Sequence, residues 1–96
     1  MKQYITFGQS HSHRLGDTLF DKDCVATFPA LNGTQGRRLA FKIFGDKFCF
    51  HYADQPPFME YFPRGFVEIP LDIRKAALQS LIQESEEASE EKDTRG

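Results

Sequence analysis

The stretch ITFGQSHSHRLGDTLFDKDCVATF, residues 5–28, decides the fold. Apolar and polar side chains alternate at both of its ends, in residues 5–7 and 24–28, with the period of a half-buried strand. Gly16 and Asp17 between these ends suit a two-residue turn, because glycine accepts a positive φ without strain. The stretch therefore predicts a β-hairpin that reverses at Gly16 and Asp17.

The position of this turn fixes the register of the predicted hairpin. The expected facing pairs are Leu15 with Thr18, His13 with Phe20, His11 with Lys22, Gln9 with Cys24, Phe7 with Ala26, and Ile5 with Phe28. Side chains alternate between the two faces of a strand. One face is therefore predicted to carry Ile5, Phe7, His11, His13, Phe20, Cys24, Ala26 and Phe28. Asp21 and Asp23 are predicted to lie on the other face.

The histidines and aspartates of the hairpin are also candidate metal ligands. His11 and His13 form an HxH pair and Asp21 and Asp23 a DxD pair, and zinc or another divalent metal accepts imidazole and carboxylate ligands. A regular hairpin points the two pairs apart, so a joint site requires a break in the ladder near residues 8–12 or 21–23. The simpler interpretation is hydrogen-bonded histidines, charge-paired aspartates and no bound metal or cofactor.

A helix and a strand are predicted after the hairpin. Residues 34–44 carry an apolar stripe at helical spacing, with Thr34 as the N-cap and Gly45 as the stop. KFCFHY, residues 47–52, is a predicted strand that points Phe48, Phe50 and Tyr52 to one side.

The C-terminal part predicts a strand at 66–70 and a helix at 73–87 that Asp72 caps. The apolar face of this helix consists of Ile73, Ala77, Leu78, Leu81 and Ile82, and we expect it to pack on its own sheet rather than on a second copy. The order β-β-α-β-β-α predicts an α+β fold, with a small, mainly antiparallel sheet of about four strands covered by helices. Residues 1–83 form the expected single domain, and residues 84–96 an acidic, disordered tail.

The net charge of −2 is unevenly distributed along the chain. Residues 1–72 hold eight basic and eight acidic side chains, whereas residues 73–96 hold four basic and six acidic ones. The basic stripe of a general nucleic-acid binder is missing, so that class is disfavoured. No apolar run approaches the roughly 20 residues of a membrane span.

Cys24 and Cys49 are two isolated thiols without CxxC spacing. The N-terminal segment MKQYITFGQ lacks the apolar core of a signal peptide. Together these features predict reduced cysteines in a cytoplasmic protein. Cys24 beside a histidine resembles a nucleophile pair, but a third orienting group is not evident, and we expect no enzyme activity.

The loop over residues 53–65 is the candidate binding surface. It combines two prolines with several aromatic side chains and an arginine, a composition typical of protein recognition. The predicted binding residues are Phe58, Met59, Tyr61 and Arg64, helped by Arg37 and Arg38 of the first helix.

Three segments together resemble a group of small uncharacterised proteins encoded by bacteriophages and prophages. These segments are YITFGQSHSHRLGDTLFDKDCVA, GRRLAFKIFGDKFCFHY and YFPRGF, which lie in order within residues 4–69. The shared pattern is FGQxHxH, KDCVA, FGxKFxFxY and FPRG. The resemblance implies a phage or prophage origin and the host cytoplasm as location, and it carries no established activity.

The first functional hypothesis is a small binding protein that inhibits or modulates a host protein, for example a defence factor such as a CRISPR effector or a nuclease. The alternative is a protein that binds a metal or a phosphorylated nucleotide through the hairpin, as a nucleotide sponge or a minimal hydrolase. A third hypothesis is a structural module that dimerises through the C-terminal helix.

Overall fold

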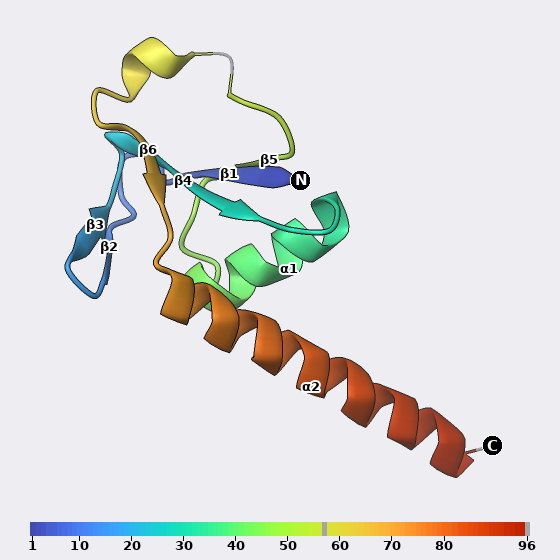
Figure 1. Ribbon diagram of the computed structural model, residues 1–96. Helices are drawn as coiled ribbons and strands as arrows, with labels where there is room; N and C mark the ends of the chain where they lie inside the picture. Colours follow the sequence, from blue (N-terminus) through green and yellow to red (C-terminus); the bar gives the residue numbers. More distant parts are fainter. Residues whose placement is uncertain (57, 96) are drawn as a thin grey trace.

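The two arms of the predicted hairpin form the centre of a four-stranded sheet. The computed structural model describes residues 1–56 and 58–95, with side chains through Glu84. Within these residues the elements are β1 (Lys2–Thr6), β2 (His13–Leu15), β3 (Thr18–Phe20), β4 (Cys24–Pro29), α1 (Gly33–Phe44), β5 (Phe50–Tyr52), the 3-10 helix η1 (Met59–Tyr61), β6 (Gly65–Glu68) and α2 (Leu71–Arg95). The sheet order is β5-β1-β4-β6. Helix α1 covers one face, and the loop that contains η1 (residues 58–65, the η1 loop) lies over the other (Figure 1). The predicted α+β class is confirmed.

The turn of the hairpin lies where the sequence places it. His13 pairs with Phe20 and Leu15 with Thr18 in the two-stranded ribbon β2-β3. Gly16 has φ 61°, a conformation that glycine adopts without the steric penalty of other residues.

Beyond this ribbon the predicted register is wrong by two residues. Ile5 faces Ala26 rather than Phe28, because both arms leave the ladder between the ribbon and the sheet. On one arm Gly8, with φ 65°, starts a turn. On the other, the Asp21 carboxylate accepts a hydrogen bond of 3.0 Å from the backbone N–H of Asp23. A shift of two residues leaves the side chains of β1 and β4 on their predicted faces, since the period of a strand is two.

The apolar face of the hairpin forms the core, as predicted. Six of its side chains expose 1% or less of their surface: Ile5, Phe7, Phe20, Cys24, Ala26 and Phe28. They pack against the predicted stripe of α1, in which Leu39, Ala40 and Phe44 are buried and Ile43 is partly buried. Strand alternation and helical spacing therefore identify the same interface from both sides.

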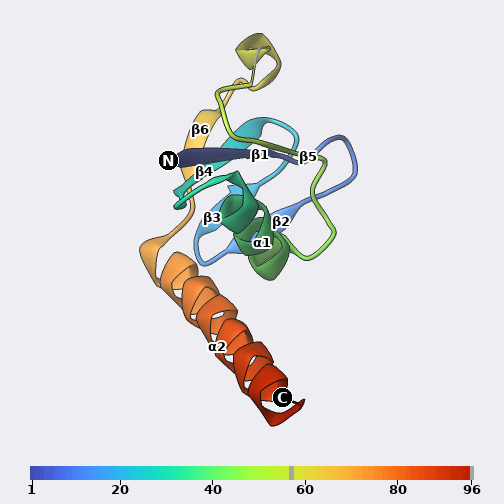
Figure 2. The same ribbon diagram turned by 90° about the vertical axis from the view of Figure 1, so that its right-hand side faces the viewer.

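The sheet is mainly antiparallel, as predicted, but β6 pairs with β4 in parallel. The chain crosses from β5 at one edge to β6 at the other through the η1 loop (Figure 2). Both outer strands are shorter than predicted. Phe48 leaves the expected strand and packs against the core, and Ile69 continues beyond β6 as a buried residue whose N–H donates to the Thr27 carbonyl at 3.0 Å.

Helix α1 begins with a different cap from the predicted Thr34. Asn32 is the N-cap, and its side-chain oxygen accepts a hydrogen bond of 2.9 Å from the N–H of Gln35. The Gln35 side chain in turn accepts from the N–H of Leu31 at 2.8 Å, so two free amides at this end are satisfied. Gly45, with φ 65°, ends the helix as predicted.

Helix α2 packs within the same chain, but mainly on α1 and not directly on the sheet as expected. Its Ala77 and Leu81 are buried in the core cluster, and Lys42 of α1 pairs with Glu84 of α2. The backbone is helical to Arg95. The disorder predicted for residues 84–96 stays a prediction, because the side chains after Glu84, and Gly96 as a whole, lie outside the described part of the chain. Dimerisation through α2 also stays a prediction. Among the described residues, no helix has the length and apolar character needed to cross a bilayer.

Candidate functional site

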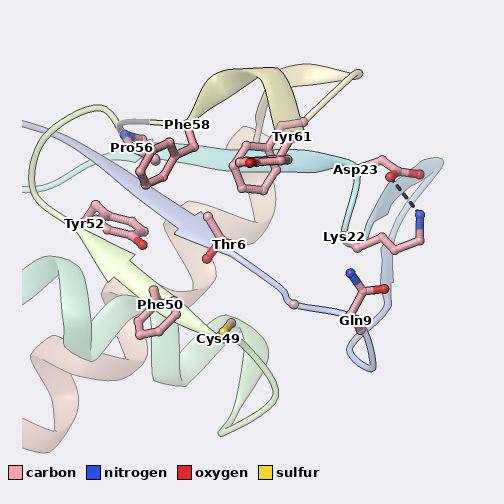
Figure 3. A pocket seen from close by; sticks show the side chains of 12 residues that line it. Thr6, Gln9, Lys22, Asp23, Cys49, Phe50, Tyr52, Pro56, Phe58 and Tyr61 are labelled. Atoms are coloured by element: carbon pink, nitrogen blue, oxygen red, sulfur yellow. Dashed lines mark hydrogen bonds and ion pairs between the residues drawn. The ribbon is translucent and has the colours of Figure 1, made fainter.

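A pocket of about 440 Å³ opens on the sheet face opposite α1. Figure 3 shows Phe58 and Tyr61 on one side of it, Phe50 and Tyr52 on the other, and Thr6 between them. We call this the open-face pocket. Its lining residues are Thr6, Gly8, Gln9, Lys22, Asp23, Cys49, Phe50, Tyr52, Pro56, Phe58, Tyr61 and Phe62.

Strand alternation places the floor and one wall of the open-face pocket. Thr6 pairs with Phe50, so these two side chains share a face of the sheet. Ile5 and its partner His51 point to the opposite face, toward α1. There the His51 Nε2–H donates to Gln3 Oε1 at 2.6 Å, and burial together with nearby Arg37 lowers the pKa of His51.

The η1 loop provides the other wall. Its short 3-10 turn presents Phe58 and Tyr61 together, with ring centroids 6.0 Å apart. Their exposed fractions are 59% and 69%, which is high for aromatic side chains. The loop closes with Gly65, whose N–H donates to the Phe62 carbonyl at 2.8 Å and whose φ of 69° suits glycine.

Arg64 anchors the η1 loop to the hairpin. Its guanidinium donates to the Asp21 carboxylate at 3.1 Å and to the Leu19 carbonyl at 2.7 Å. The backbone N–H of Arg64 also donates to the Asp23 carbonyl at 2.9 Å. Arg64, which the sequence suggested as a binding residue, therefore has a structural role in holding the wall of the pocket.

A pair of opposite charges closes one end of the open-face pocket. The Lys22 ammonium donates to the Asp23 carboxylate at 2.9 Å, and this bond raises the pKa of Lys22. Their side chains are 51% and 36% exposed, so water competes for both groups. Lys22 and Asp23 lie in one of the two turns that interrupt the predicted ladder. Gln9, which also lines the pocket, lies in the other turn.

The two cysteines occupy different environments. Cys49 lines the open-face pocket and is exposed, whereas Cys24 is fully buried and burial raises the pKa of its thiol. Because the thiolate is the reactive form, we expect the disulfide reagent DTNB to modify Cys49 at least about ten-fold faster than Cys24 in the folded protein. Absorbance should show one fast thiol in buffer and two in denaturant. In Cys49→Ser the fast phase should vanish, and its persistence would contradict this assignment.

The predicted binding residues do not form one surface. Phe58 and Tyr61 line the open-face pocket, and Met59 is half-buried on η1. Arg37 and Arg38 lie on α1, across the sheet from the η1 loop (Figure 1). Arg37 stacks over the Phe41 ring there, at 5.2 Å from the centroid. The two arginines are therefore separate from the loop they were expected to assist.

The four candidate metal ligands do not form one site, and three of them contact other groups of the chain. The His13 ring packs 5.0 Å from that of Phe44, and its Nε2–H donates to the Lys47 carbonyl at 2.6 Å. Asp21 pairs with Arg64, Asp23 pairs with Lys22, and His11 is half-buried in the turn region. Within the part of the chain that the structure describes, no three His, Cys, Asp or Glu side chains gather as a metal site.

Some pocket residues were not among the predicted binding residues. Phe50 and Tyr52 were expected to share a face, but the sequence did not indicate that the η1 loop would lie over this face. Lys22 was expected as a counter-charge of the aspartates, which its ion pair with Asp23 matches, but not as a pocket residue. Thr6 gave no signal, since a threonine in a strand is ordinary.

Comparison of the chain with protein-family models, with curated proteins and with solved structures finds no match in any of the three. Function is therefore inferred from the pocket itself.

Proposed function

We propose that this chain is a non-enzymatic binding protein that inhibits or modulates a host protein through the open-face pocket and its rim. The observation that carries the proposal is the exposure of Phe50, Phe58 and Tyr61, at 58%, 59% and 69%, around a concave site. Exposed aromatic side chains beside a pocket are typical of the residues that dominate binding energy in protein interfaces.

The lining of the open-face pocket favours binding over catalysis. Among the described residues that line it, the charged groups are Lys22 and Asp23, and they pair with each other. General acid–base chemistry requires a titratable group that is held against the substrate and is free to exchange a proton with it. An exposed ion pair at the end of an aromatic groove does not meet that requirement.

The η1 loop is also suited to binding because it is fastened before a partner arrives. Arg64 makes two side-chain hydrogen bonds to the hairpin, and its backbone makes a third. A preorganised loop loses little conformational entropy when it binds, so more of the contact energy contributes to affinity.

The kind of partner follows from the resemblance to phage and prophage proteins. Small phage-encoded proteins without enzyme activity often act by binding and blocking a host component. We therefore propose a host defence factor, such as a CRISPR effector or a nuclease, as the target in the host cytoplasm. This step is by analogy and is independent of the pocket geometry.

Affinity capture from an extract of the bacterial host tests the proposal. The immobilised wild-type chain is compared with Phe58→Ala/Tyr61→Ala, which removes two rim rings, and with Leu31→Ala as a control. Leu31 is an exposed apolar residue, 79% accessible, that does not line the pocket. We expect one protein to be captured by the wild type and by Leu31→Ala, and its recovery to fall at least about ten-fold with the double variant.

Two outcomes would contradict the proposal. One is equal capture by the double variant when circular dichroism shows that it is folded. The other is loss of capture in Leu31→Ala, which would place the interface elsewhere. If the proposal is correct, the purified target should lose activity when the wild-type chain is added. The double variant should leave the activity of the target unchanged.

A further inference from the structure

We infer that the open-face pocket receives an arginine side chain of the bound protein, an inference that rests on the proposed function and deepens it. The pocket combines two pairs of aromatic rings with one carboxylate, and this combination recognises a planar cation.

The aromatic walls of the open-face pocket are suited to a planar cation. Phe58 and Tyr61 form one pair, with ring centroids 6.0 Å apart, and Phe50 and Tyr52 form the other, also at 6.0 Å. The face of an aromatic ring carries negative electrostatic potential and its edge positive potential, so a ring attracts a cation that approaches its face. A guanidinium stacks flat on such rings, which a compact ammonium does not.

Asp23 supplies the carboxylate for this cation. The neighbouring Asp21 is already bound by Arg64, which leaves Asp23 as the carboxylate that lines the pocket. Asp23 is paired with Lys22, but the Lys22 side chain is 51% exposed and its ammonium can return to water. An incoming guanidinium, with its fork of N–H donors, forms the stronger bond to a carboxylate. Lys22 therefore competes with the ligand and does not bind it.

The same chemistry occurs twice elsewhere in the chain. Arg64 bonds Asp21 and the Leu19 carbonyl immediately beside the pocket, and Arg37 stacks on Phe41 behind the sheet. The aromatic rings and the Asp23 carboxylate of the pocket therefore suit the same ligand, a guanidinium.

NMR titration with a small probe tests the inference without the partner. The probe is Nα-acetyl-arginine amide, and its matched control is Nα-acetyl-citrulline amide, which has nearly the same shape and no charge. We expect the arginine probe to bind with a dissociation constant on the order of millimolar and to shift the signals of Phe50, Phe58 and Tyr61. The citrulline probe should bind at least about five-fold more weakly. Equal binding of both probes, or no binding of either, overturns the inference.

Two charge variants test the sign of the effect. Asp23→Asn should weaken binding of the arginine probe about five-fold or more, because the carboxylate is lost. Lys22→Met should strengthen binding about two-fold or more, because the competing ammonium is removed. Stronger binding of the arginine probe to Asp23→Asn, or weaker binding to Lys22→Met, contradicts the inference. Glu60→Gln is the control, since Glu60 is exposed on η1 but does not line the pocket, and it should bind like the wild type.

The captured target separates failure of this inference from failure of the proposed function. Both hold if Phe58→Ala/Tyr61→Ala and Asp23→Asn each lose the target. If the target is lost only with the ring variant and the arginine probe does not bind, the inference is wrong and the proposed function stands. If the ring variant retains the target, the proposed function is wrong whatever the probe does.

Discussion

Phe44→Ala is expected to lower the free energy of unfolding by about 3–5 kcal/mol, the usual loss for a buried phenylalanine. The Phe44 ring lies at the junction of helix, sheet and ribbon. Its centroid is 5.0 Å from that of Phe7, 5.0 Å from that of His13 and 5.9 Å from that of Phe20. Removing the ring leaves a cavity at the point where α1 holds the β2-β3 ribbon, and the surrounding rings cannot all close on it.

Guanidinium denaturation followed by circular dichroism measures this loss, with Phe41→Ala as the matched control. Phe41 lies one turn earlier on the same helix, but it is 44% exposed and its ring contacts Phe48 at 5.1 Å. Its removal should lower the free energy of unfolding by less than about 1.5 kcal/mol, because less apolar surface is lost. Equal losses in the two variants would show that the Phe44 ring does not hold helix, sheet and ribbon together.

Local chemistry explains why the core was predictable. The turn at Gly16 and Asp17 requires a residue that accepts a positive φ, and glycine there has φ 61°. Alternation along the strands fixes which side chains face inward, and this holds even when the register changes by an even number of residues. The stripe around Leu39 and Phe44 depends only on the helical repeat. Each of these signals lies within a few residues of the feature it predicts.

The break in the hairpin ladder could not be predicted, because neighbouring strands decide it. Gly8 and Asp21 both suit a turn, but they suit an uninterrupted hairpin nearly as well. The pairing of the sheet favours the turn, because β1 pairs with β5 on one side and with β4 on the other. The cap of α1 shows the same limit at shorter range. Asn32 and Thr34 are both good caps, and the extended backbone at Asn32 decides between them.

The open-face pocket was even harder to predict from the sequence than the break in the ladder. Its outer wall depends on Arg64 reaching the Asp21 carboxylate, 43 residues earlier in the chain. Composition identifies the η1 loop as rich in aromatic residues, but it cannot state which rings remain exposed. That depends on the path of the chain from one edge of the sheet to the other. The loop residues Phe58 and Tyr61 were therefore found, whereas Phe50 on β5 was not.

Gly36→Ala is expected to lower the free energy of unfolding by about 1–3 kcal/mol, the range for overpacking a well-filled site. In an ordinary helix position the same change would raise it by about 1 kcal/mol, because alanine is the better helix former. The opposite sign follows from the Gln3 side chain, which is fully buried against this turn of α1. A Cβ added at Gly36 would lie 2.5 Å from Gln3 Oε1 and 2.6 Å from its Cδ and Cγ.

Gly33→Ala is the matched control for this variant, because Gly33 lies in the same helix and a Cβ there meets no atom within 4 Å. It should leave stability unchanged or raise it by up to about 1 kcal/mol. Thermal and guanidinium denaturation should therefore show a lower free energy of unfolding in Gly36→Ala. In Gly33→Ala the free energy of unfolding should be equal to that of the wild type or higher. A stabilising Gly36→Ala would mean that Gln3 moves aside freely.

Gln3 cannot move aside freely, because its amide oxygen accepts the hydrogen bond from His51 that joins β1 to β5 below the pocket floor. Shortening it in Gln3→Ala removes both the bond and the clash. In that background Gly36→Ala should be neutral or stabilising, so the two substitutions are expected to be coupled by about 1–3 kcal/mol in a double-mutant cycle. Additive effects would contradict the clash. Glycine at this position thus serves the packing of Gln3 and not the flexibility of the helix.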